Sequence, residues 1–146
     1  MGRPNSGAID QAIIGTLQAD ATLAALIPDG VYFNLAAPGK KRFGLVGIFE
    51  AVDVGIFGQR GWEDTLYFVK AVGLSTVTTL ANMKAAAHRI DELLERAPLT
   101  VTDYAFMACV REERLADTVP DPIDASLFWF HFGGHYRVTA AWPDPV

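Results

Sequence analysis

Two histidines near the C-terminal end of the chain are spaced in a way that could bind a metal ion. His131 and His135 lie on either side of Gly133 and Gly134. Imidazole nitrogens are common zinc ligands, and two of them four residues apart on a helix face the same ion. Adjacent glycines disfavour a helix, and in a strand a bend at the glycines leaves both side-chain directions undefined. We therefore expect strand histidines beside an aromatic face and no metal site.

The other reactive side chains also lack partners for chemistry. His88 falls on the polar side of a helical pattern, near Lys84 and Glu92, which is typical of a solvated surface. Cys109 lies in an apolar strand pattern without an activating neighbour, so we expect a buried, inert thiol. A single cysteine excludes an intrachain disulfide and a cysteine metal cluster, and it fits a reducing compartment.

An acidic stretch and a glycine-rich stretch resemble ligand loops only in composition. The acidic residues are Glu112, Glu113, Asp117, Asp121 and Asp124. Pro120 and Pro122 interrupt them and the spacing of a calcium loop is absent, so we expect a solvated loop over residues 117–124. Residues 55–61 contain three glycines but no Lys-Ser or Lys-Thr pair follows, which argues against a phosphate loop.

Bulk composition favours a single domain without a basic surface. The chain has 146 residues, 51% of them hydrophobic, and a formal net charge of −5. This length supports one well-filled core, so residues 1–146 are expected to form one domain with short flexible ends at about 1–6 and 143–146. The negative charge disfavours tight binding to many phosphates. The N-terminus is polar and no apolar stretch has the length of a membrane span, so we expect no membrane partner.

The elements that must position these side chains follow from hydrophobic periodicity. Helical spacing begins at Ile9, and Asp20 would interrupt its apolar face unless it caps a second, short helix. Alternation predicts strands near residues 31–33, 45–54, 62–72, 104–114 and 127–142, and a long amphipathic helix runs from a cap at residues 75–79 to about Arg96. This order indicates an α+β fold, with a mostly antiparallel sheet of four to five strands and two main helices packed on one face.

Neither long central strand has a purely polar side, so we expect the second face of the sheet to be apolar. Tyr67, Val69 and Trp129 are assigned to that face, where a patch of this kind usually marks a partner surface. Residues 55–61 are expected to form a long hairpin tip that exposes Ile56 and Phe57. The glycine pair at residues 133 and 134 is expected to mark a bulge or bend in the last strand.

Several segments resemble the tail-completion, or tail-terminator, family of long-tailed bacteriophages and gene-transfer particles. They are residues 18–26 (QADATLAAL) followed by 30–32 (GVY), 60–66 (RGWEDTL), 86–94 (AAHRIDELL) with 97–99 (APL) behind it, and 136–138 (YRV). The resemblance covers roughly residues 9–138 and consists of element order and hydrophobic pattern. The chain departs from it in the apolar character of residues 54–61 and in the loop at 117–124.

The resemblance implies a structural protein of the virion neck, made in the bacterial cytoplasm, with no catalytic residues and no cofactor. Such a protein would assemble with itself into a ring, expected to be a hexamer, on the head-proximal end of the tail tube. It would stop growth of the tube protein and meet the head-tail connector protein. DNA would pass through the ring without sequence-specific binding, and an acidic chain suits such a lumen because like charges repel.

On this hypothesis, the loops and the apolar strand face supply the assembly contacts. The expected contact residues are Lys40, Lys41, Arg42, Ile56, Phe57, Gln59, Arg60, Tyr67, Val69 and Trp129. The alternative is a small-ligand-binding α+β dimer with a pocket between the long helix and the sheet. An enzyme that uses His131 or His88 is disfavoured, because the sequence offers no nucleophile or base-orienting partner for either.

Overall fold

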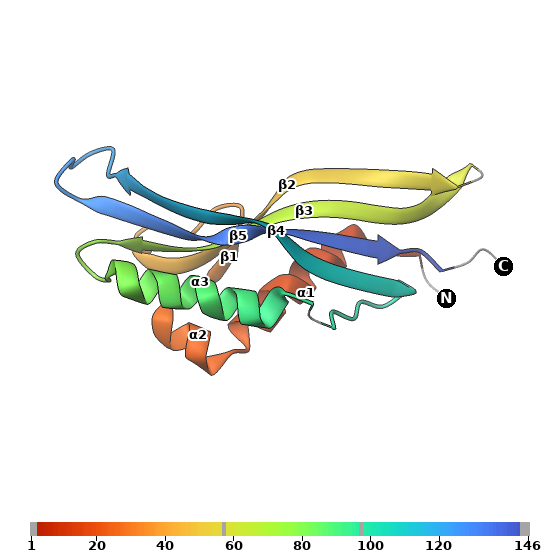
Figure 1. Cartoon of the computed structure of the whole chain (residues 1–146), viewed down its shortest axis with the longest axis horizontal. Coiled ribbons are helices and arrows are strands. Elements are labelled where there is room, and N and C mark those ends of the chain that lie inside the picture. Colours follow the sequence, from red (N-terminus) through yellow and green to blue (C-terminus); the bar gives the residue numbers. More distant parts are fainter. Residues whose placement is uncertain (1–2, 57, 97, 144–146) are drawn as a thin grey trace.

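A computed structural model describes residues 3–56, 58–96 and 98–143, and it places three helices on one face of a five-stranded sheet (Figure 1). The elements are α1 (Ser6–Gln18), α2 (Ala21–Leu26), β1 (Val31–Phe33), β2 (Arg42–Ile56), β3 (Gln59–Leu74), α3 (Leu80–Leu94), β4 (Phe106–Pro120) and β5 (Phe128–Ala141). The strand order is β1-β2-β3-β5-β4. β1 pairs with β2 in parallel, and the other neighbouring pairs are antiparallel. The predicted α+β class is confirmed.

A side-chain cap begins each helix, and for α2 and α3 the sequence predicts its place. The Asn5 side chain accepts a hydrogen bond from the Gly7 N–H at the start of α1, and Thr79 caps α3. Asp20 caps α2, so the first helical stretch is indeed broken there. A cap satisfies backbone N–H groups that have no partner within the helix, which is why these short polar side chains decide the boundaries.

Asp20 also joins α2 to α3. Its carboxylate accepts hydrogen bonds from the Leu23 N–H at 2.9 Å and from the Arg89 guanidinium at 2.6 and 2.9 Å. The hydrogen bonds from Arg89, and then the one from Leu23, lower the pKa of Asp20 to about 2. The carboxylate is therefore charged at all ordinary pH values, and it holds the two helices together as a fork-shaped ion pair.

Replacing Asp20 with alanine should destabilise the protein by about 1 kcal/mol from the lost cap alone, with a further loss from the ion pair. Because folding lowers the pKa, the stabilisation is complete above the ordinary value of 3.8 and disappears as the pH falls toward 2. Urea unfolding at several pH values measures both effects. Arg89→Met, which keeps the cap and removes the ion pair, is the control. Equal losses in the two variants would contradict a separate capping contribution.

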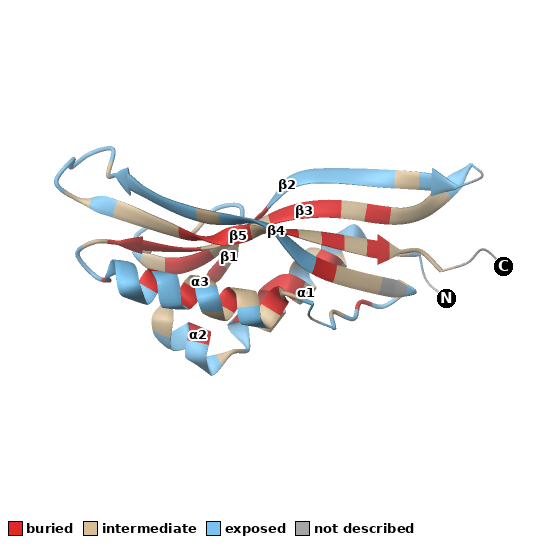
Figure 2. Ribbon diagram, viewed as in Figure 1, coloured by how far each residue is buried: buried red, intermediate tan, exposed pale blue. Residues whose placement is uncertain are grey.

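The hydrophobic core lies between the sheet and the helices (Figure 2). α1 contributes Ile9, Ile13 and Leu17, and α3 contributes Met83, Ile90 and Leu94. Tyr67 and Val69 of β3 are 1% and 0% exposed within the same core. The assignment of these two residues to the uncovered face was therefore wrong. Both sides of β3 are apolar, so its alternation alone could not show which side the helices cover.

Strands β2, β3 and β4 are longer than predicted, which shortens two expected loops. β2 continues to Ile56 and β3 begins at Gln59, so only residues 57 and 58 lie between them and the predicted long tip is wrong. Phe57 lies outside the described residues. β4 continues to Pro120, so the expected loop begins within a strand. Cross-strand hydrogen bonding extends strands through glycine and acidic residues that do not themselves favour a strand.

Gly133 and Gly134 do not mark a bulge in β5. The register of β5 with both neighbours is continuous through these residues, whereas irregularities occur between Ile48 and Glu50 in β2 and between Arg111 and Glu113 in β4. The reason for glycine at residue 133 is close contact with β3, because a Cβ atom there would lie 2.0 Å from the Val69 carbonyl oxygen.

None of the described helices combines the length and the hydrophobicity that are needed to cross a membrane.

Candidate assembly surfaces

The face of the sheet opposite the helices carries a band of charged side chains at its centre. Arg137 of β5 donates a hydrogen bond to Asp64 of β3 at 2.7 Å and another to Glu112 of β4. His135 lies 3.2 Å from Glu113 and stacks on the Phe49 ring, with 4.9 Å between ring centroids. The hydrogen bond from Arg137 lowers the pKa of Glu112. The band therefore binds β3, β5 and β4 together across the uncovered face.

Two half-buried basic side chains, Lys70 and His131, adjoin this band. Burial lowers the pKa of Lys70, although the nearby Asp117 charge acts in the opposite direction. Burial and the nearby Lys70 charge lower the pKa of His131. The buried Nδ1 atom of His131 has no hydrogen-bond partner among the described residues. His131 and His135 therefore have different surroundings and share no common ligand contact. In the described part of the chain, no group of three or more His, Cys, Asp or Glu side chains could hold a metal ion.

The surroundings of Cys109 and His88 do not activate either side chain for chemistry. Cys109 is buried, and burial raises the pKa of its thiol to about 12. A protonated, inaccessible thiol is a poor nucleophile. The His88 side chain is 75% exposed on α3, and its Nε2 atom lies 3.5 Å from Glu92. It is a solvated helix residue, as the sequence indicates.

The β2–β3 hairpin forms an arm that projects past the helices (Figure 1). Ile56 near its end is 40% exposed. Gln59 is exposed, while Arg60 lies 3.5 Å from Asp53 and places its guanidinium 4.7 Å from the centre of the Trp142 ring. Of the predicted contacts on this arm, Ile56 and Gln59 are open to a partner, and Arg60 is already used to hold the C-terminal segment.

The three cations at the start of β2, Lys40, Lys41 and Arg42, do not act as one basic patch. The Arg42 Nε–H donates to the Leu26 carbonyl at 2.6 Å, so this side chain ties β2 to α2. The backbone N–H groups of Lys41 and Arg42 donate to the Asp29 carboxylate at 3.1 Å. Lys41 is exposed and Lys40 is partly exposed, which leaves these two as candidate contacts.

The β4–β5 hairpin forms a second arm, and its tip holds a residue that the sequence analysis missed. Ile123 is 96% exposed. The Asp121 carboxylate accepts hydrogen bonds from the N–H groups of Ile123 and Asp124 at 2.9 and 3.0 Å, and from Trp129 Nε1–H at 2.7 Å. A rigid turn therefore presents an apolar side chain to solvent. The available signal was an isolated isoleucine between aspartates that favour turns.

Trp129 lies partly buried at the base of this arm. Its ring packs against Phe43, with 6.5 Å between the centroids. The three residues predicted to share one contact surface are therefore separated. Tyr67 and Val69 lie in the core, whereas Trp129 lies at the base of the β4–β5 arm and supports its tip. The part of the surface that remains accessible comprises Lys40, Lys41, Ile56 and Gln59, with Trp129 partly accessible.

The architecture is similar to that of a known virion chain, although the sequence matches no family model. No curated protein matches the sequence either. Among solved structures, the chain is similar to one in a structure described as the virion of a native gene transfer agent (GTA) particle, with a TM-score of 0.68 and 20% sequence identity. The two chains share one fold. The match covers 96% of this chain and 99% of the GTA virion chain, so the likeness extends over nearly the whole of each.

An open groove lies beside α3, on the helix side of β4. Its volume is about 590 Å³, and Leu80, Lys84, Arg111, Arg114 and Phe132 are among the residues that line it. The groove is near the place where the ligand-binding alternative expects a pocket. The described residues that line it include no set of converging buried polar groups, which small-ligand sites usually contain. A groove that is only a gap between the edge strand β4 and the helix α3 is equally compatible with the fold that this chain shares with the GTA virion chain.

Proposed function

We propose that this chain is a structural component of a phage-like or gene-transfer particle, located in the virion neck. The observation that carries the proposal is the fold shared with a GTA virion chain over nearly the full length of both chains. The resemblance of the element order and hydrophobic pattern to those of tail terminators agrees with the same proposal. The side chains of the described sites serve packing and hydrogen bonding, so a role in assembly accounts for the surface better than a reaction does.

The specific role that we propose is termination of the tail tube. Copies of the chain form a ring, expected to be a hexamer, on the head-proximal end of the tube and present their other side to the connector. Two hairpin arms at opposite ends of the sheet suit this role, because a ring between two partners needs contacts on both sides (Figure 1). The negative net charge suits a lumen that lets DNA pass without binding it.

Electron microscopy of purified tail tubes tests this role. With wild-type protein, tube ends should be capped and tubes should stop growing. Ile123→Asp should reduce tube-end or connector binding about thirtyfold, which corresponds to about 2 kcal/mol, because a charge replaces an exposed apolar anchor. The fold should be unaffected, since Ile123 contacts solvent.

Leu35→Asp is the matched control, because Leu35 is 82% exposed in a different loop. It should leave binding unchanged. If Ile123→Asp bound both partners as tightly as the wild-type protein, the tip of the β4–β5 arm would have no role in docking. If the wild-type protein left tube ends uncapped, the terminator role itself would be refuted.

The second candidate is a small-ligand-binding dimer, which the groove beside α3 favours. A ligand there should raise the melting temperature, and Ala87→Trp should abolish that rise by filling the groove. A protein that caps tubes and gains no stability from a panel of small metabolites would exclude this candidate.

A further inference from the structure

In the described structure, parts of two strand edges at opposite sides of the sheet lack a partner. On the outer side of β2, the Val46 carbonyl accepts a hydrogen bond from the Asn34 N–H at 2.7 Å. Beyond Val46, no backbone group of the described chain bonds to the outer side of residues 47–56. On the outer side of β4, the region after α3 covers Cys109, whose carbonyl accepts from the Arg96 N–H. Residues 112–120 then pair with β5 alone in the described structure.

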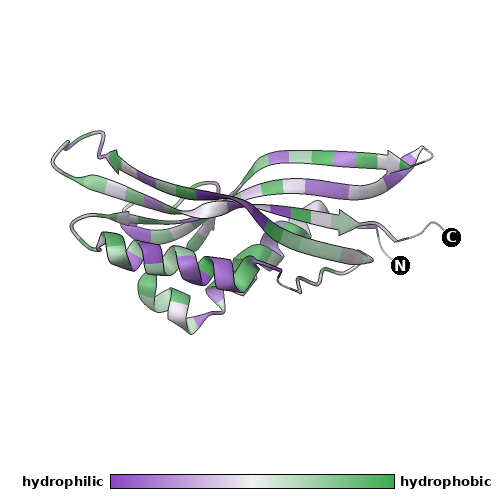
Figure 3. Cartoon of the chain, viewed as in Figure 1, coloured by the Kyte–Doolittle hydropathy of each residue, from purple (hydrophilic) through white to green (hydrophobic). Residues whose placement is uncertain are grey.

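The free edge of β2 is apolar. Its exposed large hydrophobic residues are Ile48, Phe49, Val52 and Ile56, with exposed fractions of 40–64%. Hydrophobic residues recur along this strand to the end of its arm (Figure 3). Monomeric proteins protect long edges of this kind with lysines, prolines or a covering loop, because an apolar edge recruits another strand. The edge of β2 therefore has the character of a surface that is covered in the assembled protein.

The free edge of β4 opposes pairing with its own copy. Residues 111–114 read Arg-Glu-Glu-Arg. Antiparallel self-pairing about the centre of this run would place Arg111 opposite Arg114, and Glu112 opposite Glu113. Like charges directly opposite each other on two strands are destabilising. A symmetric dimer of β4 in this register is thereby disfavoured.

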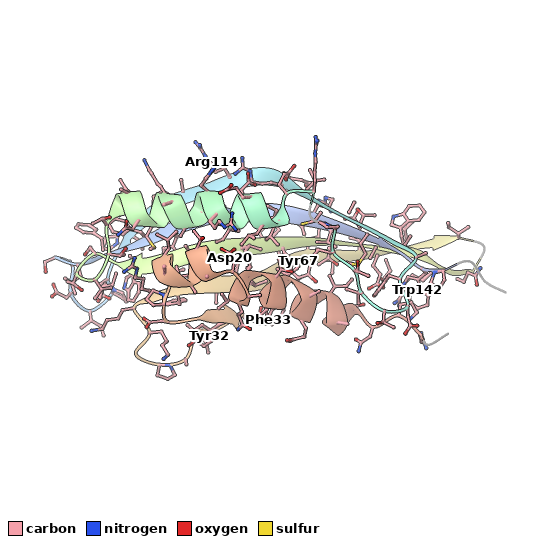
Figure 4. All side chains as sticks on the ribbon, turned by 90° about the horizontal axis from the view of Figure 1, so that it is seen from below. Asp20, Tyr32, Phe33, Tyr67, Arg114 and Trp142 are labelled. Atoms are coloured by element: carbon pink, nitrogen blue, oxygen red, sulfur yellow. The ribbon has the colours of Figure 1, made fainter. Side chains whose placement is uncertain are left out.

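The charges of β4 complement those of β2. Arg111 lies 3.6 Å from Asp91, while Glu112 and Glu113 are paired within the sheet. Among the salt bridges of the described residues, Arg114 has none. Figure 4 places Arg114 on the β4 side, across the molecule from Tyr32 of β1. The free segment of β2 carries two acidic residues, Glu50 and Asp53, and no basic residue. Asp53 already lies 3.5 Å from Arg60 of β3, but its side chain is 58% exposed, so a second cation can still reach it.

We propose that residues 51–53 of β2 pair antiparallel with residues 114–116 of β4 in a second copy of this chain. In this register, Asp53 lies opposite Arg114, Val52 opposite Leu115 and Ala51 opposite Ala116. Asp53 and Arg114 occupy the same face of the sheet, because they oppose Glu63 and Gly134, which both belong to the helix-covered face. This pairing deepens the proposed function. It rests on that function only in the expectation that the paired copies close into a ring.

The contact is heterologous, so it leaves one free β2 edge and one free β4 edge for the next copies. β2 and β4 run in opposite directions within one chain, so rotated copies continue an antiparallel sheet across the junction. The free segment of β2 lies on the arm at one end of the sheet, and that of β4 lies on the arm at the other end (Figure 1). Each junction therefore shifts the next copy along the strands. In a closed sheet such a shift is accommodated by tilting the strands relative to the axis.

Cysteine cross-linking tests this pairing. Ala51, Ala116 and the control residue Ala85 are all exposed, and the native Cys109 is buried, so a short bis-maleimide reaches only introduced cysteines. A mixture of Ala51→Cys and Ala116→Cys proteins should give covalent dimers, and the double variant should give a ladder of oligomers. Each single variant alone, and Ala85→Cys mixed with Ala116→Cys, should give at least tenfold less product.

A charge exchange tests the register. Asp53→Arg and Arg114→Glu should each weaken self-association about tenfold or more, as measured by sedimentation, and the double variant should recover most of the loss. Circular dichroism confirms that the variants fold.

Three outcomes overturn the pairing: efficient cross-linking of Ala116→Cys with itself, oligomers without cross-links between residues 51 and 116, or a protein that stays monomeric at millimolar concentration. A cross-linked ladder that fails to cap tubes would leave the pairing intact and refute the terminator role. Tube capping without such cross-links would support the terminator role and refute the pairing.

Discussion

Gly133→Ala is expected to destabilise the protein by about 3 kcal/mol, near the upper end for an overpacked site. A Cβ atom at this residue would lie 2.0 Å from the Val69 carbonyl oxygen and 2.5 Å from the Lys70 Cα atom. Both atoms belong to the backbone of β3, so no side-chain rotation relieves the overlap. β3 and β5 must separate locally, which weakens the ladder at the centre of the sheet. Urea unfolding followed by circular dichroism measures the loss.

The matched control is Gly15→Ala, the same chemical change in α1. Apart from the adjoining residues and the local helix backbone, no atom lies within 4 Å of a Cβ built there. Alanine restricts the unfolded chain and favours the helix, so this variant should be more stable by about 0.5 kcal/mol or more. Opposite signs for one substitution type would show that local crowding decides the result. An unchanged midpoint for Gly133→Ala would mean that the two strands separate at no cost, contrary to the packing described here.

Glu63→Gln is expected to cost about 3 kcal/mol, because it disrupts a buried carboxylate with three hydrogen-bond donors. Glu63 is 3% exposed. Its two oxygens accept hydrogen bonds from the Ser6 hydroxyl, the Tyr104 hydroxyl and Trp142 Nε1–H, the last at 2.7 Å. These donors come from α1, the segment before β4 and the segment after β5. Glutamine retains the shape, but it replaces the charged acceptor with one neutral amide oxygen for Tyr104 and Trp142, and the Ser6 hydroxyl would have to rotate to accept from its amide nitrogen.

The same carboxylate should make stability depend on pH. Burial alone would raise the pKa of Glu63, but the hydrogen bonds from Ser6, Tyr104 and Trp142 outweigh it and leave the pKa below the ordinary 4.5. The unfolded chain therefore binds the proton more readily than the folded one. The stabilisation is complete above pH 4.5 and is lost as the pH falls through the lower, folded-state value. Glu63→Gln should lack this component.

Glu50→Gln provides the control, because Glu50 is an exposed carboxylate on the neighbouring strand. Its effect should stay within about 0.5 kcal/mol. Unfolding free energies of the three proteins from pH 7 down to pH 3 separate Glu63 from the other acids. If the wild-type protein and Glu63→Gln lost stability in parallel as the pH fell, proton binding at Glu63 would not be linked to folding.

The local features of the fold could be predicted from the sequence. Asp20 and Thr79 each cap a helix because a short polar side chain precedes a helical pattern, and this needs only neighbouring residues. The alternation of each strand and the order of elements were likewise sufficient for the α+β class. Strand ends were less predictable. Hydrogen bonds from a paired strand carried β4 to Pro120, and no local pattern reports such a partner.

The candidate surface was predictable only in part. The exposure of Ile56 could be expected from its place near a turn, whereas Tyr67 and Val69 were assigned to the wrong side of the sheet. On a strand that is apolar on both sides, alternation separates two sets of residues without showing which set the helices cover. Ile123 was missed because a single isoleucine in a polar segment carries no periodicity, although the hydrogen bonds of Asp121 make its position rigid.

The sequence by itself determined the helices, their caps, the alternating strands and the acidic charge of this protein, because these depend on residues close together in the chain. The tertiary structure alone decided which strand face is buried, why Gly133 must lack a side chain, how Glu63 gathers donors from three segments, and which two strand edges stay free in the described part of the chain. Each of these depends on contacts between residues that are distant in sequence. Such contacts are specified by pairing and packing across the sheet, which no local pattern contains.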